Sequence, residues 1–258
     1  MDVRKALKMY KDGSLGEEEV LKVLRLDYLL NLGEKMKWDV QRAERRGVPE
    51  IVYGEVKSAE EIEGIVRKAL QSAEKILVSR ISQEKVERIN VEAIVDYNPT
   101  ARMAVYRRKG ERPKKTGGKV GLLCGGTADV PVAEEARCTA EEMGCTVYRH
   151  YDVGIAALHR VLDAMIDLHE KDVDSIIAVA GMEGTLPSIV SALSTVPVVG
   201  VPTGMGYGVA KNGRTAFNTM LSSCSLGLVV VNVDNGVGAG VAAALIANRS
   251  AAFRRQSP

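Results

Sequence analysis

Glycine-rich loops follow short apolar runs in the second half of the chain, and their polar side chains are the candidates for chemistry. In the first loop, CGGTADVP at 124–131, Gly125 and Gly126 let a ligand approach the backbone, and the N–H groups of the helix that follows favour an anion. Asp129 is either part of that site or a turn and cap residue. The loop has neither GxGxxG nor GxxxxGK[ST], so it predicts neither a dinucleotide fingerprint nor a phosphate loop.

The second loop, AGMEGTLP at 180–187, holds Glu183 between two glycines just after an apolar strand. A carboxylate that faces a cleft there can act as a general base. The alternative is a residue at a helix start, stabilised by the helix dipole. Position alone does not separate these interpretations.

The third loop, VPTGMGYGVAKNGR at 201–214, carries Thr203 and several glycines. Its N–H groups can form a nest for an anion, or the loop simply covers the next helix. After the following strand, Asp234 and Asn235 are suited to a hard divalent cation, or to the turn before the last helix.

Cys224 lies in SSCSLG, among three serines. Free cysteines are usually buried and inert, whereas this polar neighbourhood is typical of a cleft. The four cysteines form no CxxC pair and have no histidines at zinc spacing, so we expect free thiols. On the residues alone, the inert interpretation of Cys224 is ahead. His159 and His169 lie ten residues apart on a predicted helix, and we interpret them as surface or cap residues. Neither these two nor His150 lies in any of the loops above.

Apolar strands and amphipathic helices alternate from residue 119 onward, which predicts a buried parallel sheet. The pattern indicates a flavodoxin-like, doubly wound fold with ligands at the carboxyl ends of the strands, where the loops above gather. The expected strands are 119–125, 145–150, 175–181, 197–202 and 226–233. The expected helices are 130–144, 154–171, 185–193, 207–221 and 238–248.

A smaller N-terminal α/β domain is expected over 1–106. Residues 1–46 are predicted helical, with Ser14 and Glu17 as a capping box. Strands are expected at 49–54, 74–80, 92–97 and 102–107, and helices at 58–73 and 81–89, the first capped by Ser58 and Glu61. The basic segment 107–118 has no apolar residue and predicts a solvated linker to a domain over 119–258, rather than a phosphate site.

The bulk composition is that of an ordinary globular protein. A net charge of +2 gives no reason to expect nucleic acid or an anionic membrane, and 4% aromatic residues argue against a platform for single strands. No apolar run reaches about 18 residues, and the N-terminus is too polar for a signal peptide. We therefore expect a cytoplasmic protein.

Taken together, the loops resemble a known family. GTADVPVAEEA, VAGMEGTLPSIV, PVVGVPTGMGYG, MLSSCSLG and VVNVDNGVGAG are similar to the C-terminal domain of the LarB family, the carboxylase/hydrolase of nickel-pincer nucleotide cofactor biosynthesis. DVQRAERRGVPEIVYGEVKS and NPTARM are similar to its N-terminal part, so the resemblance spans about 25–248. The C-terminal half is more distantly similar to aminoimidazole ribonucleotide (AIR) carboxylase/mutase. There a histidine directly precedes LP, where this chain has Thr185.

The resemblance implies carboxylation of the pyridinium ring of nicotinate adenine dinucleotide at C5 and cleavage of its phosphoanhydride. CO2 or bicarbonate would be co-substrate, Mg²⁺ would assist hydrolysis, and no organic cofactor is implied. Cys224 would add to the ring and Glu183 would move the proton. Asp129 and Asp234 would help with the metal. The implied substrate-binding residues are Gly126, Thr127, Ala128, Asp129, Gly181, Met182, Pro202, Thr203, Gly204, Asn235 and Arg102.

Further expectations come with the same resemblance. Arg42 and Arg45 would join Arg102 in binding the adenylate half, and Ala128 stands where many relatives have serine. The related folds imply a homo-oligomer, an octamer, and the small residues of GVGAGVAAALIA suit close helix packing between subunits. The alternatives are an AIR carboxylase/mutase, which Thr185 disfavours, and a nucleotide-binding regulator, which would not need the thiol of Cys224.

Overall fold

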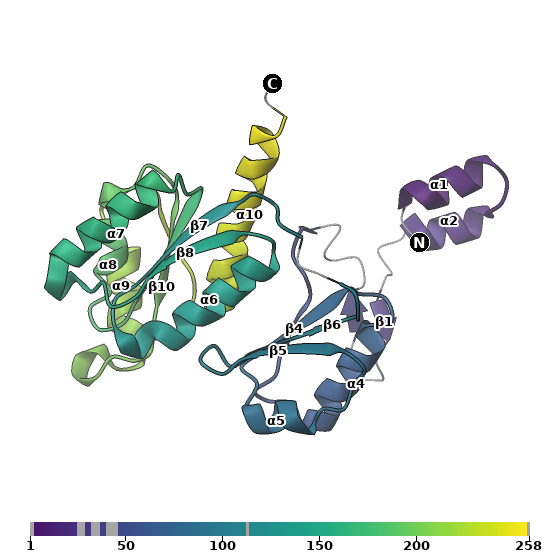
Figure 1. Cartoon of the computed structure of the whole chain (residues 1–258), viewed down its shortest axis with the longest axis horizontal. Coiled ribbons are helices and arrows are strands. Elements are labelled where there is room, and N and C mark those ends of the chain that lie inside the picture. The colour runs from purple at the N-terminus through teal and green to yellow at the C-terminus, as the bar shows by residue number, and fades with distance from the viewer. Residues whose placement is uncertain (1–2, 25–28, 32–36, 40–45, 112–113, 257–258) are drawn as a thin grey trace.

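The computed structural model describes residues 3–24, 29–31, 37–39, 46–111 and 114–256, which form two α/β units with a pair of short helices ahead of them (Figure 1). The C-terminal sheet has the strand order β11-β10-β9-β7-β8, and every neighbouring pair is parallel. Its strands are β7 Lys119–Cys124, β8 Thr146–His150, β9 Ser175–Ala180, β10 Val198–Pro202 and β11 Leu228–Val230. This order confirms the predicted flavodoxin-like sheet and puts its switch point between β7 and β9.

Helices cover both faces of this sheet. The core on one face contains α6 (Val130–Glu142) and α10 (Gly236–Arg254), and the core on the other contains α7 (Leu158–Glu170), α8 (Leu186–Leu193) and α9 (Arg214–Leu221). By length and composition alone α10 is apolar enough to cross a membrane, but Ala239, Ala243 and Ala247 bury one side of it in the core with α6. It is longer at both ends than the helix predicted over 238–248.

The N-terminal unit is a sheet of order β3-β4-β6-β5, in which β3 and β4 are parallel and the other pairs are antiparallel. Its elements are β3 Ile51–Tyr53, α4 Ala59–Ala69, β4 Lys75–Ser79, α5 Gln83–Arg88, β5 Ile94–Asn98 and β6 Met103–Arg107. The predicted capping box of α4 is present, because Ser58 and Glu61 exchange both hydrogen bonds. Ile62, Val66 and Tyr106 form its core with the sheet.

The prediction that residues 1–46 are helical is wrong for part of that range. α1 (Val3–Lys11) and α2 (Glu17–Leu24) are helical, but β1 (Leu29–Asn31) and β2 (Lys37–Asp39) pair as an antiparallel hairpin. A short apolar run such as Leu29–Leu30 does not separate helix from strand by periodicity. The predicted capping box is also wrong, since the Ser14 hydroxyl donates to the Met9 carbonyl while Glu19 accepts from the Gly16 N–H.

Polar contacts through α6 join the two units. Glu142 accepts from the Nη1 and Nη2 atoms of Arg107 at 2.8 and 2.6 Å and from Lys75 Nζ at 2.9 Å. Nearer the N-terminus of α6, Glu134 Oε2 accepts a hydrogen bond from Asn98 Nδ2 at 2.7 Å. Val48, from the segment before β3, is buried in the core between the C-terminal sheet and α10. The chain between Arg107 and Lys119, where the linker was predicted, connects the two sheets.

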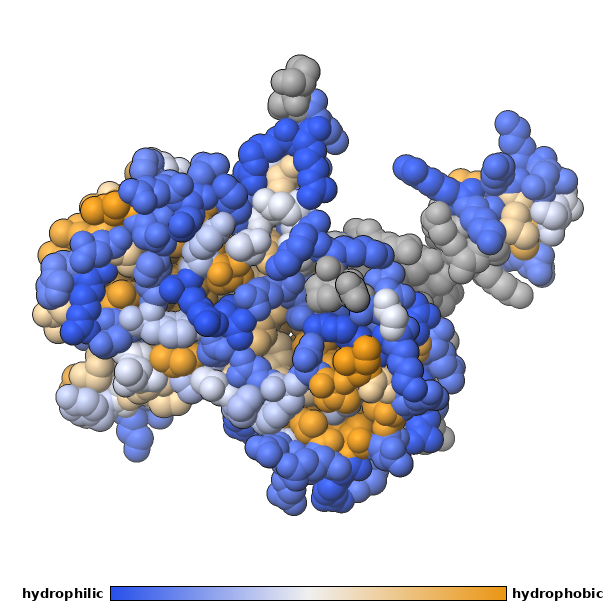
Figure 2. All heavy atoms as spheres, in the orientation of Figure 1, coloured by the Kyte–Doolittle hydropathy of each residue, from blue (hydrophilic) through white to orange (hydrophobic). Residues whose placement is uncertain are grey.

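Apolar side chains also remain exposed on the surface. Leu158, Leu162 and Ile166 lie one turn apart along the outer side of α7 and are 47%, 43% and 59% exposed. Figure 2 shows hydrophobic atoms gathered over α7 at the left edge of the molecule. We call these three residues the α7 stripe.

Candidate functional site

A cavity of about 200 Å³ opens at the switch point of the C-terminal sheet. Its walls come from the loops after β7 and β9 and from residues 154–156, and it is lined by Gly125, Gly126, Asp129, Gly154, Ile155, Ala156, Ala180, Gly181, Met182, Glu183, Gly184, Thr185 and Leu186. The structure therefore brings together five of the predicted site residues: Gly126, Asp129, Gly181, Met182 and Glu183.

The loop after β9 is held in an unusual conformation. A Cβ on Gly181 would lie 2.7 Å from Thr203 Oγ1, and one on Gly184 would lie 2.5 Å from Ala216 Cα, so both positions require glycine. Between them Met182 has φ 48°, a left-handed conformation that a side chain rarely adopts. Strain of this kind is kept where the surroundings force it, often at functional sites. Here it presents the exposed carboxylate of Glu183 at the cavity.

Asp129 ties this cavity to the next loop. Its carboxylate is buried, accepts a hydrogen bond from the fully buried Thr203 hydroxyl and accepts another from the Gly126 N–H at 3.2 Å. Burial raises the pKa of Asp129 above its ordinary value, against the opposing effect of these hydrogen bonds. The carboxylate thus braces the loops after β7 and β10.

Asp234 plays a similar part between the loops after β10 and β11. Its Oδ1 accepts from the Gly204 N–H at 2.8 Å, and its φ of 56° lies in the left-handed region. Among the residues that the structure describes, no three His, Cys, Asp or Glu side chains form a group able to hold a metal ion. Asp129 is buried and both of its carboxylate oxygens accept hydrogen bonds, while Asp234 accepts through Oδ1. The assignment of a Mg²⁺ ion to these two residues stays a prediction.

Cys224 does not line this cavity in the single chain. It is exposed in the loop between α9 and β11. This loop precedes β11, whereas Asp234 follows the strand at its other end. The neighbouring Ser225 hydroxyl fixes this loop by donating to the Ser188 carbonyl at 2.9 Å. The other three thiols are less available, since burial raises the pKa of Cys124 to about 12 and those of Cys138 and Cys145 to about 11.

The remaining predicted residues are distributed around these features. Thr127 and Ala128 are exposed in the single turn η1 (Thr127–Asp129), and Pro202 ends β10. The Arg102 side chain is about half exposed, with Nη1 3.7 Å from Glu55 Oε1, and it does not line the switch-point cavity. The predictions for Arg42 and Arg45 lie outside the described residues.

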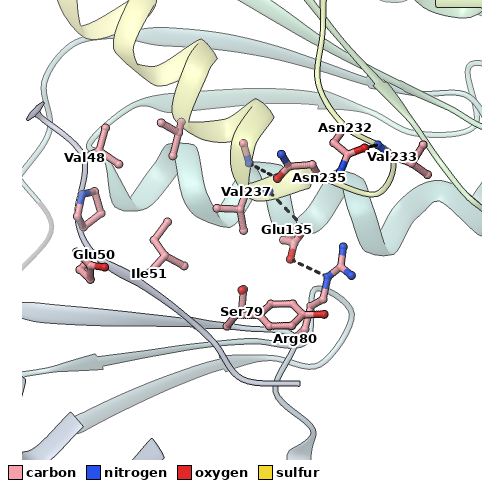
Figure 3. Close-up of a pocket in the computed structure, with 14 residues that line it drawn as sticks. Val48, Glu50, Ile51, Ser79, Arg80, Glu135, Asn232, Val233, Asn235 and Val237 are labelled. Carbon is pink, nitrogen blue, oxygen red and sulfur yellow. Dashed lines mark hydrogen bonds and ion pairs between the residues drawn. The ribbon is translucent and has the colours of Figure 1, made fainter. Parts of the chain in front are cut away.

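A larger pocket, of about 550 Å³, lies between the two units, and we call it the interdomain pocket (Figure 3). The N-terminal unit and the segment before it contribute Val48, Pro49, Glu50, Ile51, Tyr53, Ser79 and Arg80. The C-terminal unit contributes Glu135, Asn232, Val233, Asn235, Val237, Gly238 and Val241. Asn235, a predicted site residue, therefore lies here and not at the switch-point cavity.

Arg80 connects the two units at this pocket. Its Nη2 donates to the Asp234 carbonyl at 2.5 Å, and its Nε lies 3.8 Å from Glu135 Oε1. Sequence reasoning missed Arg80, because an arginine at the end of a strand carries no signal of what it will meet. The sequence did contain a signal for Glu135. This residue is acidic, yet its helix neighbours Val132, Ala133 and Ala136 are apolar and lie in the core. Burial raises the pKa of Glu135, although the charge of Arg80 opposes this.

Comparisons with known proteins agree with this architecture. Residues 119–257 match the family model of AIR carboxylase, which puts the protein in the class of PurE-like carboxylases. Residues 30–109 match the LarB/PurE-like N-terminal domain. The chain therefore belongs to the LarB family, whose C-terminal domain is related to AIR carboxylase.

Individual relatives give the same picture. An uncharacterized protein of Methanocaldococcus jannaschii is 41% identical over 254 residues, which cover 95% of this chain and 97% of the relative. The N5-carboxyaminoimidazole ribonucleotide mutase of Thermotoga maritima is 30% identical over 133 residues, 50% of this chain and 74% of the mutase. The mutase of Pyrococcus horikoshii is 30% identical over 144 residues, 54% of this chain and 75% of its own.

Proposed function

We propose that this protein carboxylates the pyridinium ring of nicotinate adenine dinucleotide at C5 and hydrolyses the phosphoanhydride. The products are pyridinium-3,5-biscarboxylate mononucleotide and AMP, and they serve nickel-pincer cofactor synthesis in the cytoplasm. One observation carries the proposal: Glu183 lines the switch-point cavity together with Thr185, which stands at the position where the mutase pattern has histidine. None of the described residues that line the cavity is a histidine, so the proton-transfer group available there is a carboxylate.

The proposed chemistry uses a thiolate and a carboxylate. The Cys224 sulfur adds to C4 of the pyridinium, and the ring electrons move onto nitrogen. C5 of the resulting dihydropyridine then forms a bond to CO2. Glu183 takes the C5 proton, the C4–S bond breaks, and the thiolate leaves with the bonding pair as the aromatic cation is restored. The positive ring favours the thiolate form by direct charge attraction.

Cys224 and Glu183 do not meet within one chain, and this shapes the proposal. Cys224 is exposed, and the apolar neighbours Leu221, Leu226 and Val229 are 60%, 92% and 53% exposed. Such a surface is typical of an interface. We infer that the protein is a homo-oligomer, an octamer, in which Cys224 of one copy reaches the cavity of another. In this proposal Asp129 and Asp234 would hold the Mg²⁺ ion that neutralises charge on the phosphates during hydrolysis.

The test is incubation of the purified protein with nicotinate adenine dinucleotide and ¹³C-bicarbonate, with and without Mg²⁺, followed by mass spectrometry. We expect a ring product heavier by one labelled carboxylate, together with AMP. Cys224→Ala and Glu183→Gln should abolish carboxylation, whereas Cys138→Ala, which removes a thiol outside the cavity, should keep it. Full turnover by Cys224→Ala would overturn the covalent mechanism.

The likeness to the mutases supports a second candidate, conversion of N5-carboxyaminoimidazole ribonucleotide. Offering that ribonucleotide in the same assay separates the candidates. Turnover of the ribonucleotide and not of the dinucleotide would assign the protein to purine chemistry despite Thr185. Binding of the dinucleotide without turnover, unchanged in Cys224→Ala, would indicate a regulator.

A further inference from the structure

The interdomain pocket has both apolar and polar side chains in its lining. Val48, Ile51 and Val241 are among the apolar ones, and Ser79, Asn232 and Asn235 among the polar ones. In Figure 3, Val48, Ile51 and the carboxylate of Glu50 lie on one side, and Arg80, Asn232 and Val233 lie on the other. Tyr53 also lines the pocket, with the Arg80 guanidinium 5.8 Å from its ring centroid. Pockets with apolar walls and a few placed polar groups are typical of small-molecule sites.

Charged groups are built into this pocket. Glu135 is 4% exposed, accepts from the Val237 N–H at 3.3 Å and lies 3.8 Å from Arg80 Nε. A buried carboxylate stays charged only where such partners hold it. Arg80 has φ 51° and Asp234 φ 56°, so strained residues stand on both sides of the contact between the units. Strain at both ends of one contact indicates that the surroundings fix this geometry.

The loop after β11, which contains Asp234, connects the interdomain pocket to the switch-point cavity. The carboxylate of Asp234 holds the Gly204 N–H beside Thr203, whose hydroxyl donates to Asp129 in the cavity wall. The carbonyl of the same Asp234 accepts from Arg80, and the flanking Asn232 and Asn235 line the interdomain pocket. A ligand long enough to touch both sites therefore crosses this loop.

We propose that the interdomain pocket binds the adenosine half of the dinucleotide and that Arg80 meets its phosphate. This inference rests on the proposed function. The apolar walls suit a planar base, the asparagine amides and Ser79 suit its polar edge, and Tyr53 suits stacking. Glu135 is an acceptor for ribose hydroxyls, as acidic residues are in other nucleotide sites. The guanidinium of Arg80 has a fork of donors that matches phosphate oxygens.

The test measures binding of AMP and of nicotinate mononucleotide to the full chain by calorimetry. Val241→Trp and Ile51→Trp fill the pocket from opposite walls, and Val56→Trp places the same side chain on an exposed site outside it. We expect each filling variant to weaken AMP binding by at least about tenfold and to leave the mononucleotide unchanged, whereas Val56→Trp binds both as the unmodified protein does. Arg80→Met should weaken AMP binding more than adenosine binding.

A cooperative thermal unfolding transition shows that a variant is folded. If one of the two filling variants does not fold, the other still tests the inference. AMP binding that survives both fillings, or that fails in the unmodified protein at millimolar concentration, would overturn the inference. AMP binding lost in Met182→Trp, at the switch-point cavity, instead of in the filling variants would do the same. These outcomes are independent of turnover: AMP bound in the pocket without carboxylation would sink only the proposed reaction.

Discussion

The thiols of this protein differ in environment, and that difference makes a test at the scale of single residues. Burial raises the pKa of Cys124 to about 12, and those of Cys138 and Cys145 to about 11, so their reactive thiolate forms are scarce at neutral pH. Cys224 is exposed. Brief treatment with iodoacetamide at pH 7.5 should therefore label Cys224 first, as peptide mass spectrometry can measure. Earlier labelling of any of the other three would contradict this arrangement.

Glycine at position 181 is a second residue-scale test. Gly181→Ala would put a methyl 2.7 Å from Thr203 Oγ1 and 3.0 Å from Asp129 Oδ1. Such overpacking costs about 1–3 kcal/mol, which we expect to appear as a lower free energy of unfolding in urea. Gly64→Ala is the matched control, because its added methyl would have no atom within 4 Å, and alanine in a helix is favoured by about 1 kcal/mol. Equal effects of the two variants would refute the steric argument.

At the scale of elements, α6 is the helix on which the two units meet. Burial alone would raise the pKa of Glu134, but hydrogen bonds from Arg137, Tyr151 and Asn98 outweigh it and lower that pKa to about 2. The folded value lies below the ordinary 4.5, so this stabilisation is present above about pH 4.5 and is lost as the pH falls toward 2.

Glu134→Gln should consequently lower the free energy of unfolding at pH 7 by about 2 kcal/mol, after allowing for solvent screening. The difference from the unmodified protein should shrink as the pH falls from 5 to about 2, which denaturant titrations across that range can follow. Glu84→Gln, on the exposed side of α5, should have little effect at any pH. A difference that stays constant with pH would argue against the charged network.

The sequence predicted the elements unevenly, for physical reasons. Strong alternation of apolar strands and amphipathic helices located every strand of the C-terminal sheet, and the loops at its carboxyl edge followed from the fold class. β1 and β2 were missed because their short apolar runs stand in a region whose leucines and valines were interpreted as the apolar stripe of a helix. Gly238, Gly240 and the small residues after them were expected to suit close helix packing, and within the chain Gly236 and Gly240 let α10 pack closely on Val132 and Ala136 of α6. The interdomain pocket depends on how two units dock, which no local pattern encodes.

At the scale of the whole molecule, exposed apolar surface predicts self-association. The α7 stripe exposes Leu158, Leu162 and Ile166 along one side of a helix, a pattern that usually packs against something. We expect light scattering after size exclusion to give the mass of an oligomer, and the double variant Leu162→Asp, Ile166→Asp to lower it. Asp163→Asn, on the same helix, should leave the mass unchanged. A monomeric unmodified protein would contradict both this prediction and the proposed meeting of Cys224 and Glu183.

The burial of Val48 has a consequence for any attempt to separate the two halves of the chain. Val48 comes from outside the C-terminal unit, yet it shares a core with Val120, Ala244 and Ala247. A C-terminal half that begins at the linker lacks this side chain and leaves a gap in its own core. We therefore expect the separate half to have a lower free energy of unfolding than the same unit in the full chain.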